Sequence, residues 1–120
     1  MGDAPPKIIS VLFWSQANGK EPVREWLKSL SKEQRRIIGE DIKTVEIGWP
    51  LGMPLVRSLG KGLWEVRSSF PNGIARVLFM MFDHKMVLLH GFIKKSQKTP
   101  SQDLEIALRR AKMLEQSNEK

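Results

Sequence analysis

The sequence predicts an α+β domain in which an antiparallel β-sheet carries an N-terminal helical hairpin and a C-terminal helix, in the order βααββββα. Apolar residues recur at helical spacing within residues 22–48 and 101–115, whereas residues 55–93 follow the twofold period of strands. The connections between the later strands are too short for crossovers, so those strands must be antiparallel. The length fits a single domain, residues 1–120, and the absence of cysteine excludes disulfides and thiolate chemistry.

The first half of the chain is predicted to hold one strand and two helices. Residues 8–14 begin with β-branched side chains and form the expected first strand. Pro22 suits the first turn of a helix, and Ser31-Lys-Glu-Gln34 has the form of a capping box that opens a second helix ending at Gly48. The near absence of a loop between these helices predicts a hairpin. Their apolar stripes are Val23, Trp26, Leu27 and Leu30, and Ile37, Ile38, Ile42 and Val45.

The middle of the chain is predicted to form an antiparallel meander. Phe70-Pro-Asn-Gly73 is a strong turn signal, and another short turn follows residue 82. The two later strands are apolar on both faces, which places them at the centre of the sheet with helices covering one side. The expected strands are residues 55–59, 63–69, 74–82 and 86–93.

The last element is predicted to be a helix. Thr99 is expected to cap it, with Pro100 at the first helical position. Its buried stripe consists of Leu104, Ala107, Leu108, Ala111 and Leu114. The chain ends, residues 1–7 and 116–120, are expected to be flexible.

The basic residues are concentrated in one segment. The formal net charge is +7, and residues 51–100 contain eight Lys and Arg side chains against only two acidic ones, Glu65 and Asp83. Such a field favours a polyanion, most often nucleic acid, so residues 51–98 are expected to build a basic sheet surface that grips an RNA backbone. A basic face kept for solubility is the alternative. The side chains assigned to RNA binding are Arg57, Lys61, Lys85 and Lys98.

Arg67 and Arg76 form the central pair of this predicted surface. A loop of two or four residues in the hairpin between them puts both on the same face of the sheet. Like charges in that position are mildly destabilising unless an anion, or an acid such as Glu65, lies between them. The pair is therefore either a surface Arg–Glu–Arg ladder or a phosphate clamp, because guanidinium groups bind phosphate oxygens bidentately.

Three further residues are candidates for chemistry. Lys94 and Lys95 lead from the end of a buried strand into a helix start, where a rigid strand can aim a mobile loop; a solvated basic linker is the alternative. His90 shares a face with Lys94 by alternation and is either structural or catalytic. Two histidines without cysteine do not support a zinc site, so no metal or cofactor is expected. Aromatic side chains interpreted as core rather than base-stacking are Trp14, Trp26, Trp49, Trp64 and Phe92.

Several segments resemble the phage-derived HigB-like branch of the RelE/HigB toxins, which belong to type II toxin–antitoxin pairs. The resemblance spans roughly residues 8–115 of the chain. It implies a RelE-like fold, with two helices packed on a twisted antiparallel sheet. The segments that carry it are Gly62-Leu-Trp-Glu-Val-Arg67, Ala75-Arg-Val-Leu78, Leu88-Leu-His-Gly-Phe-Ile-Lys-Lys95 and Gln97-Lys-Thr-Pro100.

The resemblance also implies an activity, the ribosome-dependent cleavage of mRNA by metal-independent attack of the 2′-hydroxyl on the adjacent phosphate. Arg67 matches a basic catalytic position of the family, and Arg76 matches the arginine that opens its next strand; both are assigned to catalysis. Lys94 and Lys95 match the basic pair that ends its last strand. The chain lacks the tyrosine that RelE uses, and the Glu–His pair of other branches cannot be located. The general base and acid therefore stay open among Lys94, Lys95 and His90.

The implied partners are mRNA on the ribosome and a cognate antitoxin, expected to be a HigA-like helix-turn-helix protein. The alternative is a non-catalytic relative that binds a protein target, as ParE-type toxins bind gyrase, or an RNA-binding module. The first residues do not resemble a secretory signal, and the longest apolar stretch, residues 77–82, is too short to span a bilayer. A cytoplasmic protein without a membrane partner is expected.

Overall fold

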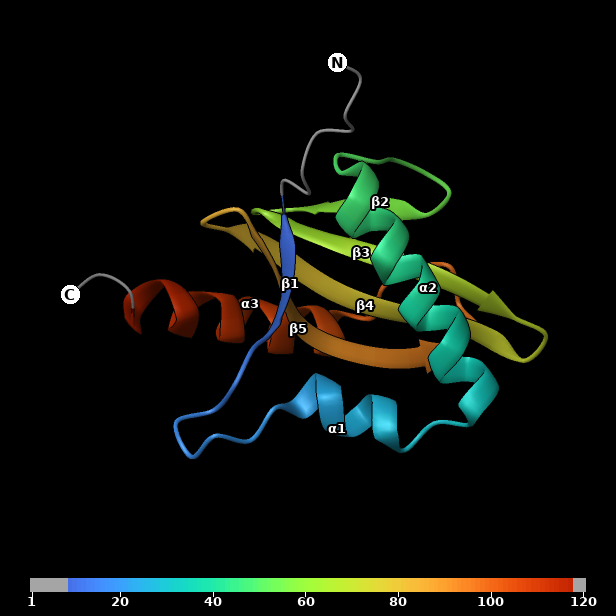
Figure 1. Cartoon of the computed structure of the whole chain (residues 1–120), viewed down its shortest axis with the longest axis horizontal. Coiled ribbons are helices and arrows are strands. Elements are labelled where there is room, and N and C mark those ends of the chain that lie inside the picture. Colours follow the sequence, from blue (N-terminus) through green and yellow to red (C-terminus); the bar gives the residue numbers. More distant parts are fainter. Residues whose placement is uncertain (1–8, 118–120) are drawn as a thin grey trace, which may run out of the picture.

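A five-stranded mixed β-sheet forms the middle layer of the fold, and helices cover both of its faces (Figure 1). The computed structural model describes residues 9–117. The predicted α+β class is confirmed. Along the chain the elements are β1 (Ser10–Phe13), α1 (Pro22–Lys28), α2 (Lys32–Gly48), β2 (Val56–Gly60), β3 (Leu63–Phe70), β4 (Gly73–Phe82), β5 (Lys85–Lys94) and α3 (Ser101–Ser117).

The sheet is not antiparallel throughout. Its strand order is β1-β5-β4-β3-β2, and the four strands from β2 to β5 form the predicted antiparallel meander. β1 instead pairs with β5 in parallel, with Ser10 opposite Lys85 and Phe13 opposite Leu88. The prediction of an antiparallel sheet was therefore wrong for this strand. Parallel neighbours need a long connection, which α1, α2 and the other strands supply.

Helices lie on both faces of the sheet, whereas the sequence predicted them on one. In Figure 1, α2 crosses in front of the sheet and α3 passes behind it. α1 packs on β5 and α2 on β3, so the two helices diverge from their short connection instead of lying side by side as a hairpin (Figure 1). Two separate cores result, which explains why β4 and β5 are apolar on both faces.

The predicted core aromatics lie in these two cores. Trp14 and Phe92 are buried on the α3 face, and the other three tryptophans pack against the core under α1 and α2. There the rings of Trp49 and Trp64 meet edge to face with their centroids 5.0 Å apart. The indoles are thus used for packing, as the sequence interpretation held.

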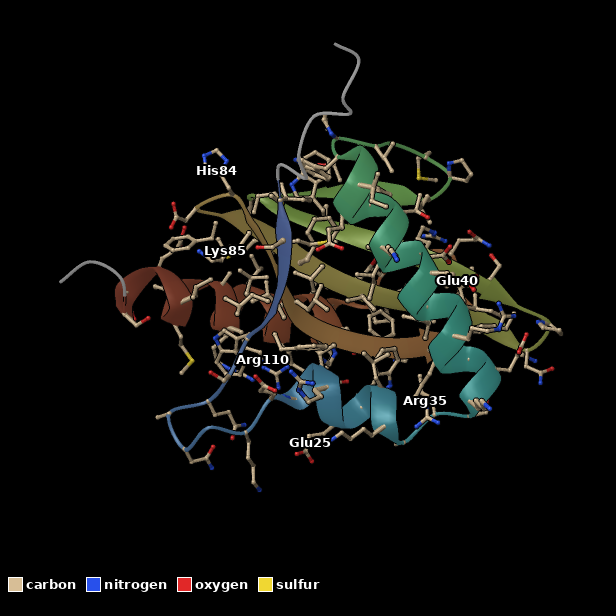
Figure 2. All side chains as sticks on the ribbon, in the orientation of Figure 1. Glu25, Arg35, Glu40, His84, Lys85 and Arg110 are labelled. Carbon is tan, nitrogen blue, oxygen red and sulfur yellow. The ribbon has the colours of Figure 1, made fainter. Side chains whose placement is uncertain are left out.

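A β-bulge in β5 fastens α3 to the sheet. Leu78 pairs with His90 but Phe79 pairs with Leu88, which leaves Leu89 as the extra residue. The Leu89 carbonyl accepts a hydrogen bond of 2.6 Å from Nη1 of Arg110, a residue of α3 (labelled in Figure 2). A backbone group that the bulge removes from the ladder thereby finds a charged donor.

Both ends of α3 differ from the prediction. The helix begins at Ser101, and the hydroxyl of Thr99 does not cap it but donates to Oε2 of Glu65. At the other end Gln116 and Ser117 are helical, although they were expected to be flexible. The rest of the expected flexible ends, residues 1–7 and 118–120, lies outside the described residues. No helix within residues 9–117 is long and apolar enough to cross a membrane.

Gly91 allows α1 to approach β5 closely. A Cβ atom added to Gly91 would lie 2.4 Å from the Trp26 ring, well inside van der Waals contact. The indole therefore rests directly on the strand backbone, and this glycine of the Leu-His-Gly-Phe segment has a packing role.

Replacing Gly91 by Ala is expected to lower the free energy of unfolding by about 1–3 kcal/mol, because the added methyl group overpacks the contact with Trp26. Gly39, exposed in α2, is the matched control, since a Cβ there meets no atom within 4 Å. Gly39→Ala should stabilise the protein by about 0.5–1 kcal/mol. Thermal unfolding followed by circular dichroism measures both changes, and an unchanged midpoint for Gly91→Ala would contradict the packing role.

Candidate functional site

Three arginines gather at one end of the sheet, on the face that α3 covers. Arg57 of β2 lies opposite Glu65 of β3, and Arg67 of β3 lies directly opposite Arg76 of β4. Paired residues, and residues two apart in a strand, project to the same face. These four side chains therefore converge, as predicted for Arg67 and Arg76. Arg57, Arg67 and Arg76 are called the arginine cluster below.

A buried carboxylate lies at the centre of the cluster. Glu65 is fully buried, its Oε1 accepts a hydrogen bond of 2.9 Å from Arg67 Nη1, and its Oε2 accepts one of 2.5 Å from Thr99 Oγ1. The side chain of Arg67 is only 8% exposed. The Arg–Glu–Arg arrangement predicted for the surface is therefore buried, where breaking a charge pair costs far more than it does in water.

Arg76 is buried more deeply than the other two arginines. It is 0% exposed, its Nη1 donates to the Lys98 carbonyl at 2.9 Å, and its guanidinium lies 5.7 Å from the centre of the Phe92 ring. Burial lowers the pKa of Arg76, and the nearby Glu65 carboxylate opposes that shift. Its Nε and Nη2 have no hydrogen-bond partner among the described residues. Unpaired buried donors are costly, so Arg76 can still bind two further acceptor atoms.

The loop formed by residues 95–99 covers the cluster. The Gln97 carbonyl accepts hydrogen bonds from Nη1 of Arg57 at 3.2 Å and from Nη1 of Arg67 at 3.3 Å. Oε1 of Gln97 accepts a third, of 2.9 Å, from Nη2 of Arg67. The loop therefore turns polar oxygens toward the arginines while the side chains of Lys95 and Lys98 are exposed.

A histidine and an aspartate stand beside the cluster. Nε2 of His90 lies 2.7 Å from Oδ1 of Asp103, and Nζ of Lys94 lies 3.5 Å from Oδ2 of the same carboxylate. The His90 ring stacks on Phe92, with centroids 5.6 Å apart, and Phe92 also contacts Arg76. The charge of Asp103 acts on the Arg76 guanidinium as well. The pair formed by His90 and Asp103 thus makes one continuous site with the arginine cluster.

The surroundings of His90 favour the neutral form of its imidazole. Burial lowers its pKa from the ordinary 6.5, and the hydrogen bond to Asp103 opposes that shift without cancelling it. A carboxylate at Nε2 assigns the proton to that nitrogen. No hydrogen bond to Nδ1 is formed within residues 9–117, so the lone pair on Nδ1 can accept a proton.

Two of the predicted RNA-binding residues lie elsewhere. Lys61 is in the turn between β2 and β3, and Lys85 follows the turn between β4 and β5, where it pairs with Asp83 at 3.6 Å. Phe82, the partner of Lys85 in the sheet, is six positions along β4 from Arg76, or about 20 Å away. Figure 2 shows Lys85 at the end of the sheet near His84. Lys61 and Lys85 therefore lie apart from the arginine cluster, and their assignment to RNA binding stays a prediction.

Asp103 was missed by the sequence interpretation. An acid in the first turn of a helix is ordinarily explained by the helix dipole. Its position in the helix could nevertheless have predicted its burial, because Asp103 lies on the same helical stripe as the buried Ala107 and Ala111. A charged residue on a buried stripe needs a partner. Gln97 was also missed, because its role depends on how the loop folds back on the sheet.

A family model described as "Phage derived protein Gp49-like (DUF891)" matches residues 25–112, a range that includes every side chain of the site. The chain therefore belongs to this phage-derived Gp49-like family, which is a family of RelE/HigB-like toxins. No curated protein matches the chain significantly. Within the described part of the chain, no three His, Asp or Glu side chains are grouped so that they could hold a metal ion.

The pKa of His90 is expected to lie below 6.5, and Asp103→Asn should lower it further, because the carboxylate favours the protonated ring. With its pKa lowered by folding, His90 stabilises the fold above pH 6.5, and this contribution is lost as the pH falls below 6.5. NMR titration of the His90 imidazole signals in the wild type and in Asp103→Asn measures both pKa values. A pKa of His90 above 6.5, or one raised by Asp103→Asn, would refute the assignment.

Proposed function

We propose that the protein is the toxin of a type II toxin–antitoxin pair and that it is a ribosome-dependent mRNA endoribonuclease. The observation that carries the proposal is the contact of 2.7 Å between Nε2 of His90 and Oδ1 of Asp103, next to a cluster of arginines. A positioned base beside cationic donors is the arrangement that transfer of a phosphoryl group to a 2′-hydroxyl requires. Membership of a RelE/HigB-like toxin family supports the toxin role.

In this reaction Nδ1 of His90 takes the proton of the 2′-hydroxyl as its oxygen attacks the adjacent phosphorus. Asp103 holds the ring and stabilises the imidazolium that forms. The bond from phosphorus to the 5′-oxygen breaks, and Lys94 or Lys95 protonates that leaving oxygen. The products are a 2′,3′-cyclic phosphate and a free 5′-hydroxyl. Such acid–base steps contribute about 10²–10⁴ in rate.

The arginine cluster supplies the charge stabilisation. The phosphorane carries more negative charge than the phosphodiester, and Arg67 and Arg76 are assigned to its non-bridging oxygens. Each well-placed donor of this kind is worth about 10²–10³ in rate. The unpaired Nε and Nη2 of Arg76 support this assignment, because they are donors held ready in a buried site.

The partners follow from the same site. The exposed side chains of Lys95 and Lys98 and the half-buried Arg57 are assigned to the RNA backbone, with the ribosome presenting the mRNA in the cytoplasm. A toxin that cleaves mRNA requires a neutralising antitoxin, expected to be a HigA-like helix-turn-helix protein. It would act by covering this end of the sheet or by preventing docking on the ribosome.

One observation favours a second function. Arg76 is fully buried and Arg67 nearly so, as residues with a purely structural role would be. The protein would then be a non-catalytic toxin that binds a protein target such as gyrase. On that alternative, cells stop growing while their transcripts stay intact.

Primer extension on transcripts from induced cells separates the two functions. We expect codon-associated cuts that fall by about 10²–10⁴-fold in His90→Gln, because the general base is lost. His84→Gln changes an exposed histidine in the turn between β4 and β5, and this variant should cut transcripts like the wild type. Growth arrest without cuts would support the protein-target function, and wild-type cutting by His90→Gln would remove His90 as the base.

Arg67→Ala is a poor choice for this experiment. Removing Arg67 leaves Glu65 buried without its charge partner, a change that typically costs about 3–5 kcal/mol. Lost activity would then report lost folding. Lys95→Ala is the better second variant, because Lys95 is exposed, and we expect it to lower cutting without shifting the thermal midpoint.

A further inference from the structure

Most of the hydrogen-bond acceptors of the arginine cluster are neutral, although guanidinium groups bind charged acceptors more strongly. Three guanidinium groups surround one carboxylate, that of Glu65, and the remaining bonds go to neutral oxygens of Gln97 and Lys98. Hydrogen bonds between two charged groups are roughly twice as strong as neutral ones. Arg76 also keeps two buried donors unpaired. The cluster therefore has both the positive charge and the donors to bind an anion.

The loop over the cluster is anchored at its two ends and only lightly in between. Before it, Lys94 pairs with Asp103 at 3.5 Å, and at its end Thr99 donates to Glu65. Between them Ser96, Gln97 and Lys98 are exposed, and their bonds to the sheet are those to the arginines. Displacing these three residues would therefore break only those bonds to the sheet.

We propose that the arginine cluster is an internal binding site for one phosphodiester group of RNA, and that the oxygens of Gln97 and Lys98 occupy this site in the free protein. The inference rests on the proposed function in taking RNA as the ligand. A phosphate group would replace neutral acceptors by charged ones and would supply partners for Nε and Nη2 of Arg76. The loop is then a built-in competitor of the substrate.

This competition makes Gln97 a determinant of affinity. When only a fraction of the molecules is open, the apparent affinity is reduced by that fraction. Gln97→Ala removes the acceptor for Nη2 of Arg67, so the loop should open more readily. Gln97→Glu keeps the shape but makes the acceptor anionic, so the loop should close more firmly. The two substitutions are therefore expected to change RNA affinity in opposite directions.

The test is the binding of a trinucleotide with 2′-O-methyl groups, which cannot be cleaved, to the full chain by calorimetry. We expect Kd to fall by about three- to tenfold in Gln97→Ala and to rise by a similar factor in Gln97→Glu, the worth of one hydrogen bond. Gln102→Glu, an exposed position nearby on α3, makes the same change of net charge. Its Kd should stay within about twofold of the wild type.

Backbone ¹⁵N relaxation gives a second readout. Ligands usually order the segments they touch, whereas here the order parameters of Ser96, Gln97 and Lys98 should fall when the trinucleotide binds, because the loop leaves the arginines. Unchanged or raised order parameters would place the RNA on top of a closed loop and overturn the proposal.

The outcomes separate this inference from the proposed function. Equal affinities of Gln97→Ala, Gln97→Glu and wild type overturn the competition, even if transcripts are cut in cells. Opposite shifts of Kd without any cut transcript support the internal phosphate site and contradict the nuclease. Failure of every variant to bind the trinucleotide overturns the site itself.

Discussion

The polar end of the sheet depends on one buried carboxylate. Glu65 binds Arg67 with one oxygen and Thr99 with the other, so it fixes both a cation of the sheet and the residue that ends the covering loop. Because Thr99 is held there, α3 begins at Ser101 and its first turn brings Asp103 to His90. The acid–base pair is therefore positioned through a contact that belongs to the arginine cluster. Such a buried charge is tolerated only while its partners stay in place.

Features of the fold set by neighbouring residues were predictable from sequence. The capping box of Ser31 and Gln34 is formed as predicted, and the turn signal in residues 70–73 set the register that pairs Arg67 with Arg76. The parallel pairing of β1 was not predictable, because alternation assigns faces but does not name a neighbour in the sheet. That helices cover both faces of the sheet was also not predictable. The periodicity of a helix shows which of its own sides is buried, but not which face of the sheet it packs on.

The candidate site was predictable in its residue types and less so in its geometry. Period placed Arg67 and Arg76 on one face, but composition does not report position along a strand. The structure brings Arg57 to this pair, whereas Lys61 and Lys85 lie at the other end of the sheet. Burial of the cluster depends on how residues 95–99 fold back, which no local pattern encodes. The partner of His90 lies thirteen residues away on another element, so pairing it with Asp103 required the structure.

The site thus combines a buried arginine cluster, held by Glu65, with a loop whose oxygens take the place of a phosphate group. A crystal structure of the full chain with the uncleavable trinucleotide examines this arrangement most directly. A non-bridging phosphate oxygen within hydrogen-bond distance of Nε or Nη2 of Arg76, with the carbonyls of Gln97 and Lys98 displaced, is the expected result. A phosphate held outside by Lys95 and Lys98, with both carbonyls still on the arginines, would contradict it.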